Sequence, residues 1–152
     1  MTKTGSPRGV DDVHWKGLLR KARQFMEIAQ NGLQLMDRGK DAGPLMSNMI
    51  LGAIAYVDTL TAAILGTINQ TDHQTAIKLL RKALGDALPK AQEGNLRALL
   101  GMKDEVQYGA GFEPVRDAES LMGRAQAFAA WAEGEIKRRF PREAIEPEDG
   151  SQ

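Results

Sequence analysis

Residues 44–65 form the most apolar stretch of the chain, and Asp58 is their only formal charge. On a helical count their apolar side chains lie all round the segment, and its glycine and alanines keep it slim. A helix that is apolar on every side is one that other helices surround. We therefore expect the central helix of a bundle here, beginning at Pro44, where a proline suits the first helical position, and closed by Gly66.

Amphipathic helices are predicted on both sides of this central helix. Apolar residues recur at three- and four-residue steps within four segments, 15–36, 76–84, 96–106 and 115–136. Glycine and proline between the segments indicate short connections. No stretch shows the period-two alternation of a strand, so no strands are expected. The sequence thus predicts an all-α protein, an up-and-down antiparallel bundle of four to five helices.

Local signals place the ends of the third and fourth helices. A capping box that begins at Thr71 predicts the start of the third. Pro89 and Gly94 oppose a continuous helix, so the fourth is placed from Leu96 to about Tyr108. At 152 residues the chain has the length of one domain. We expect a disordered leader at 1–10, a single helical-bundle domain at 11–140 and a disordered acidic tail at 141–152.

Net charge and cysteine content exclude several classes of function and site. Twenty basic residues balance twenty acidic ones, so there is no net field for a generic coating of DNA or RNA. The absence of cysteine excludes disulfides and thiolate metal sites and favours a cytoplasmic location. Neither His14 nor His73 has the Glu-x-x-His spacing of a bundle metal site, so we predict no metal and no cofactor.

Residues 44–65 also approach the length of a membrane span. Their composition is only mildly apolar, and Asp58 interrupts the uncharged core. A charge near the middle of a membrane costs about 3 kcal/mol on insertion scales. The pattern therefore favours a buried core helix, and no membrane is expected.

Asp58 is the most conspicuous single residue, because a lone carboxylate on an apolar helix must be paired, solvated or protonated. It is either a ligand-binding or acid–base group, or a carboxylate at the helix edge that reaches water or a cation. A second candidate is the polar cluster of Lys103, Glu105 and Tyr108, in which an ammonium beside a phenol and carboxylates suits a phosphate or nucleotide. The alternative there is a solvated face with a buried tyrosine ring. Asp58, Lys103, Glu105 and Tyr108 are our predicted ligand-binding residues, and no catalytic residue is assigned.

A likeness to a known family lies in the order of several motifs: W-K-x-L-L-R-K-A-R-Q-F at 15–25, the alanine-rich central helix, D-H-Q-T-A-I-K-L-L-R at 72–81, K-D-E-V-Q-Y-G at 103–109 and the helix at 117–133. Over roughly residues 12–137 the chain resembles small bacterial HEPN-type proteins, the all-α superfamily named for nucleotide binding in higher eukaryotes and prokaryotes. The resemblance implies an antiparallel bundle, dimerisation, and association with nucleotidyltransferases or toxin–antitoxin modules. Its ribonuclease members use Arg, four to six residues, then His near the last helix. No His follows residue 73 here, so no catalytic residues are carried over.

These observations lead to a first hypothesis and two rivals. The first is a non-catalytic HEPN-like binding module, a homodimer that engages a nucleotidyltransferase or antitoxin partner protein, with a nucleotide or RNA as a candidate ligand. The alternative is a metal-independent ribonuclease of a HEPN toxin whose active site is displaced to Lys103, Glu105 and Tyr108. A third is a structural interaction protein that binds no small molecule.

Overall fold

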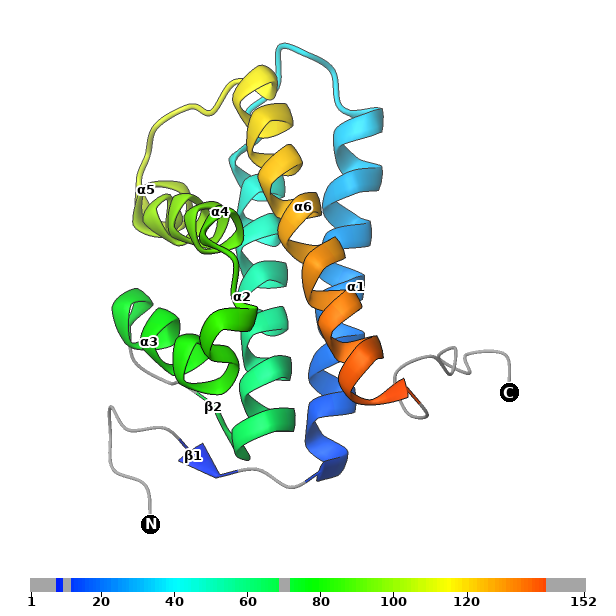
Figure 1. Ribbon diagram of the computed structural model, residues 1–152. Coiled ribbons are helices and arrows are strands. Elements are labelled where there is room, and N and C mark those ends of the chain that lie inside the picture. The colour runs from blue at the N-terminus through cyan, green and yellow to red at the C-terminus, as the bar shows by residue number, and fades with distance from the viewer. Residues whose placement is uncertain (1–7, 10–11, 69–71, 142–152) are drawn as a thin grey trace, which may run out of the picture.

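The computed structural model describes residues 8–9, 12–68 and 72–141. They form an all-α bundle, as predicted (Figure 1). In chain order the elements are β1 (Arg8–Gly9), α1 (Asp12–Leu35), α2 (Gly43–Leu65), β2 (Thr67–Ile68), α3 (His73–Leu84), the 3₁₀ turn η1 (Gly85–Ala87), α4 (Lys90–Gly101), α5 (Lys103–Tyr108) and α6 (Val115–Arg139).

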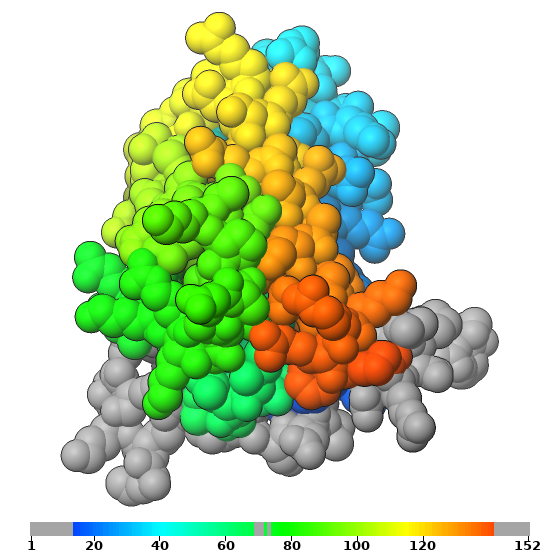
Figure 2. Space-filling view, in the orientation of Figure 1, coloured from blue at the N-terminus to red at the C-terminus, as the bar shows by residue number. Residues whose placement is uncertain are grey.

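Three long helices, α1, α2 and α6, run along the length of the bundle (Figure 1). Helix α1 rises, α2 returns beside it, and α6 descends in the same direction as α2. The segment that follows α2 in the chain and precedes α6, which we call the third leg, returns in the opposite direction. It is divided into the short helices α3, α4 and α5. On the face shown in Figure 2, these short helices and α6 cover most of α2.

Helix α2 is the hub of the bundle and contacts each of the other five α-helices. Gly52 lets α1 approach closely, because a Cβ at this position would lie 3.1 Å from the sulfur of Met26. The hydroxyl of the fully buried Thr59 donates to the carbonyl of Ala55 at 2.7 Å, so it leaves no unpaired donor in the core. Gly66 ends the helix in the left-handed conformation, at φ 74°, as the sequence predicted.

One face of α2 is less covered than the sequence suggested. Side chains at three-, four- and seven-residue steps along it are only half-buried: Ser47, Leu51, Ile54, Asp58 and Leu65. The expectation that other helices surround α2 on every side is therefore wrong for this face, because α1, α6 and the short helices close only the remaining sides. Within the described residues α2 is the one helix long and apolar enough to cross a membrane, and 61% of its most apolar window is buried in the bundle.

A charged network ties the three long helices together. Arg23 of α1 donates to both carboxylate oxygens of Glu133 on α6, at 2.8 Å each. The hydroxyl of Tyr56 on α2 donates to Glu133 at 2.8 Å. Burial, followed by the negative charge of Glu133, raises the pKa of Tyr56, while Arg23 and Tyr56 together hold the pKa of Glu133 below its usual value against the opposing effect of burial. The tyrosine is therefore a permanent donor at neutral pH.

The structure corrects the expectation that the chain has no strands. Arg8 and Gly9 pair antiparallel with Ile68 and Thr67 as strands β1 and β2. These two residues fall within the segment 1–10 that was expected to be a leader, and they lie beside the segment that follows α2. The rest of the leader and the tail from 142 onward lie outside the described residues.

The ends of the short helices also differ from the prediction. Asp72 is the N-cap of α3 and accepts the N–H of Thr75 at 2.8 Å, so the cap lies one residue after Thr71, which is outside the described residues. Pro89 is the N-cap of α4 rather than a break within a loop, and α4 runs through Gly94. The expected single helix up to Tyr108 is interrupted at Met102, which separates α4 from α5.

The network around Glu133 makes a stability prediction. Replacing Tyr56 with phenylalanine removes a hydrogen bond to a charged acceptor inside the bundle, which costs about 1–2 kcal/mol of the free energy of unfolding. Urea denaturation of the variant measures it. Tyr108→Phe is the matched control, because its side chain is 75% exposed and should leave stability unchanged. Equal stabilities for wild type and Tyr56→Phe would show that the hydrogen bond from Tyr56 to Glu133 does not stabilise the bundle.

Candidate functional site

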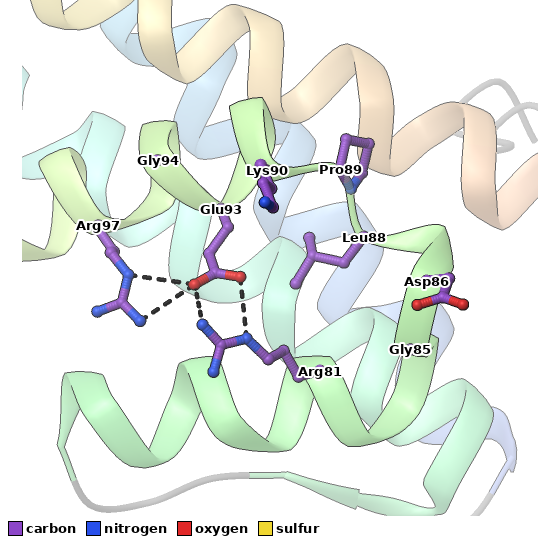
Figure 3. A pocket seen from close by; sticks show the side chains of 9 residues that line it. All are labelled: Arg81, Gly85, Asp86, Leu88, Pro89, Lys90, Glu93, Gly94 and Arg97. Carbon is purple, nitrogen blue, oxygen red and sulfur yellow. Dashed lines mark hydrogen bonds and ion pairs between the residues drawn. The ribbon is translucent and has the colours of Figure 1, made fainter.

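A groove of about 710 Å³ lies between α3 and α4. Its walls come from the last turn of α3, the turn that follows, and the first two turns of α4 (Figure 3). The lining residues are Arg81, Gly85, Asp86, Leu88, Pro89, Lys90, Glu93, Gly94 and Arg97. This volume is within the range of about 300–1,000 Å³ that is typical of ligand sites.

The groove follows from the way the chain reverses between α3 and α4. Gly85 ends α3 with a φ of 55°, a conformation that side-chain-bearing residues rarely adopt. The 3₁₀ turn η1 and the extended Pro89 then redirect the chain. Pro89 precedes α4 without a side-chain cap. The N–H groups of Gln92 and Glu93 donate to the carbonyl of Pro89, which leaves those of Lys90 and Ala91 without a capping partner among the described residues.

Glu93 is the centre of the charged groups in the groove. Its carboxylate accepts Nε of Arg81 at 3.0 Å and Nε and Nη2 of Arg97 at 3.2 and 3.1 Å, and it also pairs with Nη2 of Arg81. The Arg81 hydrogen bond, assisted by Arg97, holds the pKa of Glu93 below its usual value. Glu93 therefore stays ionised and holds two guanidinium groups side by side across the groove (Figure 3).

Helix α5 carries the predicted cluster of Lys103, Glu105 and Tyr108. Lys103 is half-buried and Glu105 is exposed. The side chain of Tyr108 is 75% exposed. The alternative interpretation of a buried tyrosine ring is therefore wrong, because Tyr108 is the last residue of a six-residue helix, just before the chain leaves the bundle.

Glu105 belongs instead to an acidic cluster with Glu113, a residue that the sequence analysis did not single out. Glu113 is only 6% exposed, and burial, then the hydrogen bond and negative charge of Glu105, raise its pKa. Asp41 accepts the backbone N–H groups of Glu113 and Gly43 at 3.0 and 2.9 Å, which lowers the pKa of Asp41 and fastens the loop before α6 to the start of α2. Carboxylates gathered in this way repel a phosphate, so this end of the bundle does not suit the ligand predicted for it.

Asp58 lies on the half-exposed face of α2. Its carboxylate has no hydrogen bond or ion pair with any residue that the structure describes. Burial raises the pKa of Asp58 to about 7. It is thus a carboxyl group that changes charge near neutral pH, far along the chain from Lys103 and Glu105 and on a different helix. None of the four predicted ligand-binding residues lines the groove between α3 and α4.

No family model and no curated protein matches this sequence. The resemblance to HEPN-type proteins therefore stays a prediction, and the functional interpretation rests on the geometry. Within the described ranges, no three or more His, Asp or Glu side chains are arranged to hold a metal ion.

The sequence held a partial signal for the groove. Glu93 and Arg97 have the i, i+4 spacing of a helical ion pair, and Lys90 precedes them by one turn. That signal was not recognised because Gly94 and Pro89 counted against a helix. Arg81 is twelve residues before Glu93 in the chain, and only the turn at Gly85 brings them together.

Asp58 makes a prediction about pH. Because its pKa is higher in the folded than in the unfolded chain, the folded protein binds the proton more tightly, and the stability this provides is lost as the pH rises from about 4 to about 7. Asp58→Asn should raise the free energy of unfolding by about 4 kcal/mol at about pH 8, because the charged form is disfavoured by about three pKa units, and the gain should shrink toward zero near pH 4.

Chemical denaturation of wild type and variant across this pH range measures the effect. Asp37→Asn is the control, since Asp37 lies on the exposed turn after α1. The inference about Asp58 fails if the pH dependence of the Asp58→Asn variant equals that of the wild type.

Proposed function

We propose that this chain is a non-catalytic, HEPN-like interaction module that acts in the cytoplasm as a homodimer and engages a protein partner. The observation that carries the proposal is an apolar seam on α1, made of Phe25, Ile28, Gly32 and Leu35. Residues three and four apart share one face of a helix, so these four positions form a continuous strip.

The seam is left over after α1 has packed in the bundle. The side chains of Ile28 and Leu35 are 53% and 85% exposed, and Phe25 is half-buried. Gly32 lies at the edge of the seam toward α2, since a Cβ there would lie 2.5 Å from a side-chain carbon of Leu45. Between Gln24 and Met36 the helix has one formal charge, Glu27. A surface strip that is apolar and poor in charge has the composition of an interface core.

The spacing of the seam suits a second copy of the same chain. Two α1 helices packed antiparallel around a two-fold axis midway between Ile28 and Leu35 would place Ile28 of each copy against Leu35 of the other. Such an interface is self-complementary, as a two-fold dimer requires. The zero net charge of the chain means that two copies do not repel each other.

The neighbouring face of α2 extends the seam. Phe25 packs against Gly52, since a Cβ on that glycine would lie 3.4 Å from the Cβ of Phe25. Leu51, next in the chain, is one of the half-buried residues on α2. A standard interface buries about 1,600 Å² in total, so we expect this face of α2 to contribute to the interface beside α1.

A non-catalytic role agrees with the placement of the polar candidates. Lys103, Glu105 and Tyr108 lie on a short helix beside a buried carboxyl, and Asp58 lies on another helix. A pair of groups for general acid–base catalysis needs hydrogen-bond reach to a common substrate. By the family resemblance, the protein partner is a nucleotidyltransferase or an antitoxin, with a nucleotide or RNA as a candidate ligand.

The test is the oligomeric state of the purified full chain, measured by analytical ultracentrifugation. We expect a dimer at micromolar concentration. Ile28→Glu or Leu35→Glu should each weaken dimerisation about a hundredfold or more. In a two-fold dimer each substitution places a charge in the interface from both copies.

Gln30→Glu is the matched control, because Gln30 is exposed on another face of α1 and gains the same charge. A wild-type chain that stays monomeric at micromolar concentration contradicts the proposal. Dissociation by Gln30→Glu to the same extent as by Ile28→Glu would place the interface elsewhere.

A further inference from the structure

We propose that the groove between α3 and α4 binds a small phosphate monoester with a hydroxyl-bearing body, such as a sugar phosphate. The inference is independent of the homodimer, because the seam lies on α1 and the groove is built by α3, η1 and α4. Either one can fail while the other stands.

Two guanidinium groups, one from α3 and one from α4, lie at one end of the groove and are held in position. Glu93 fixes Arg81 and Arg97 by Nε and Nη2 of each. A guanidinium has five N–H donors. Nη1 of each arginine, which carries two of them, makes no hydrogen bond to any described residue. The side chains are 50% and 52% exposed, whereas Glu93 is only 16% exposed. The bound carboxylate therefore orients the guanidinium groups and leaves donors for an outside anion.

Lys90 supplies a third positive charge. It projects from the first turn of α4 on the same side as Glu93 (Figure 3). Its ammonium makes no ion pair within the part of the chain that the structure describes. With Arg81 and Arg97 it gives three cations against two carboxylates, those of Asp86 and Glu93, so the lining has one net positive charge. The start of α4 also has no side-chain cap, and the positive end of its helix dipole favours an anion near Lys90.

The other end of the groove suits a hydroxyl-bearing body. Leu88 and Pro89 form an apolar wall between the cations and Asp86 (Figure 3). A carboxylate accepts hydrogen bonds but does not donate them, so Asp86 matches the hydroxyl groups of a sugar. A phosphate at Lys90 and hydroxyls at Asp86 would place one ligand along the length of the groove.

The number of cations favours a small ligand over a nucleic acid. Nucleic-acid binding depends on the neutralisation of many phosphates along an extended surface. Here three cations surround one groove, and the whole chain has no net charge. The three cations of the lining are enough to bind one phosphate group.

The experiment is isothermal titration calorimetry of the purified chain with glucose 6-phosphate, inorganic phosphate and glucose. We expect glucose 6-phosphate to bind with a Kd of about 1 mM or tighter. Lys90→Gln should weaken it about tenfold, because it removes a charge-assisted contact. Lys90 makes no ion pair within the described residues, so this variant should fold normally, and circular dichroism verifies that it does. Lys82→Gln is the matched control, since Lys82 is exposed in the last turn of α3 and does not line the groove.

Asp86→Ala separates the two ends of the ligand. If the hydroxyl-bearing body is recognised, this variant loses the preference for glucose 6-phosphate over inorganic phosphate and keeps its affinity for phosphate. The proposal is overturned if neither phosphate compound binds, if glucose binds as well as its phosphate, or if inorganic phosphate binds as tightly as the ester. It is also overturned if Lys82→Gln weakens binding as much as Lys90→Gln.

Discussion

The fold depends on covering α2. This helix of 23 residues has a single formal charge, and most of its side chains are buried. Leaving such a surface in water would cost roughly 25 cal/mol per Å² of apolar area, so the other helices are arranged around it. Close approach is possible because α2 is slim where it meets α1, at Gly52. The network of Arg23, Tyr56 and Glu133 then fixes which faces of the long helices meet, since an unpaired carboxylate at that depth would be costly.

The long helices could be predicted from the sequence, whereas the broken third leg could not. The apolar stripes of α1 and α6 and the glycine that ends α2 are local signals, and the structure has these helices close to the predicted bounds. Pro89 and Gly94 are ambiguous locally, because proline can interrupt a helix or precede one. Packing against α2, α3 and α6 decided in favour of a helix from Lys90. The pairing of Arg8 with Ile68 connects residues too far apart for periodicity to detect.

The candidate site depends even more than the fold on contacts between residues that are distant in the sequence. Asp58 was conspicuous because its helix is apolar, and the structure indeed gives it an unusual environment. The cluster on α5 could be predicted from helical spacing. The loop before α6 places Glu113 beside Glu105, which makes this cluster more acidic than its own sequence indicates. The groove needs Arg81 and Glu93 from opposite sides of a turn. Residues that their own helix makes unusual can be identified from the sequence, whereas those that only the reversal at Gly85 brings together cannot.

The broken third leg has a consequence for motion. Helices α3 and α4 have 12 residues each and α5 has six, lengths at which an isolated helix is marginal in water. They keep their structure because they dock on α2, so this leg should open locally, with faster amide hydrogen exchange, while α1, α2 and α6 remain closed. The ion pairs of Glu93 join α3 to α4 within that same cooperative unit. Any molecule that binds between them would therefore slow the exchange of the whole leg as well as occupy the groove.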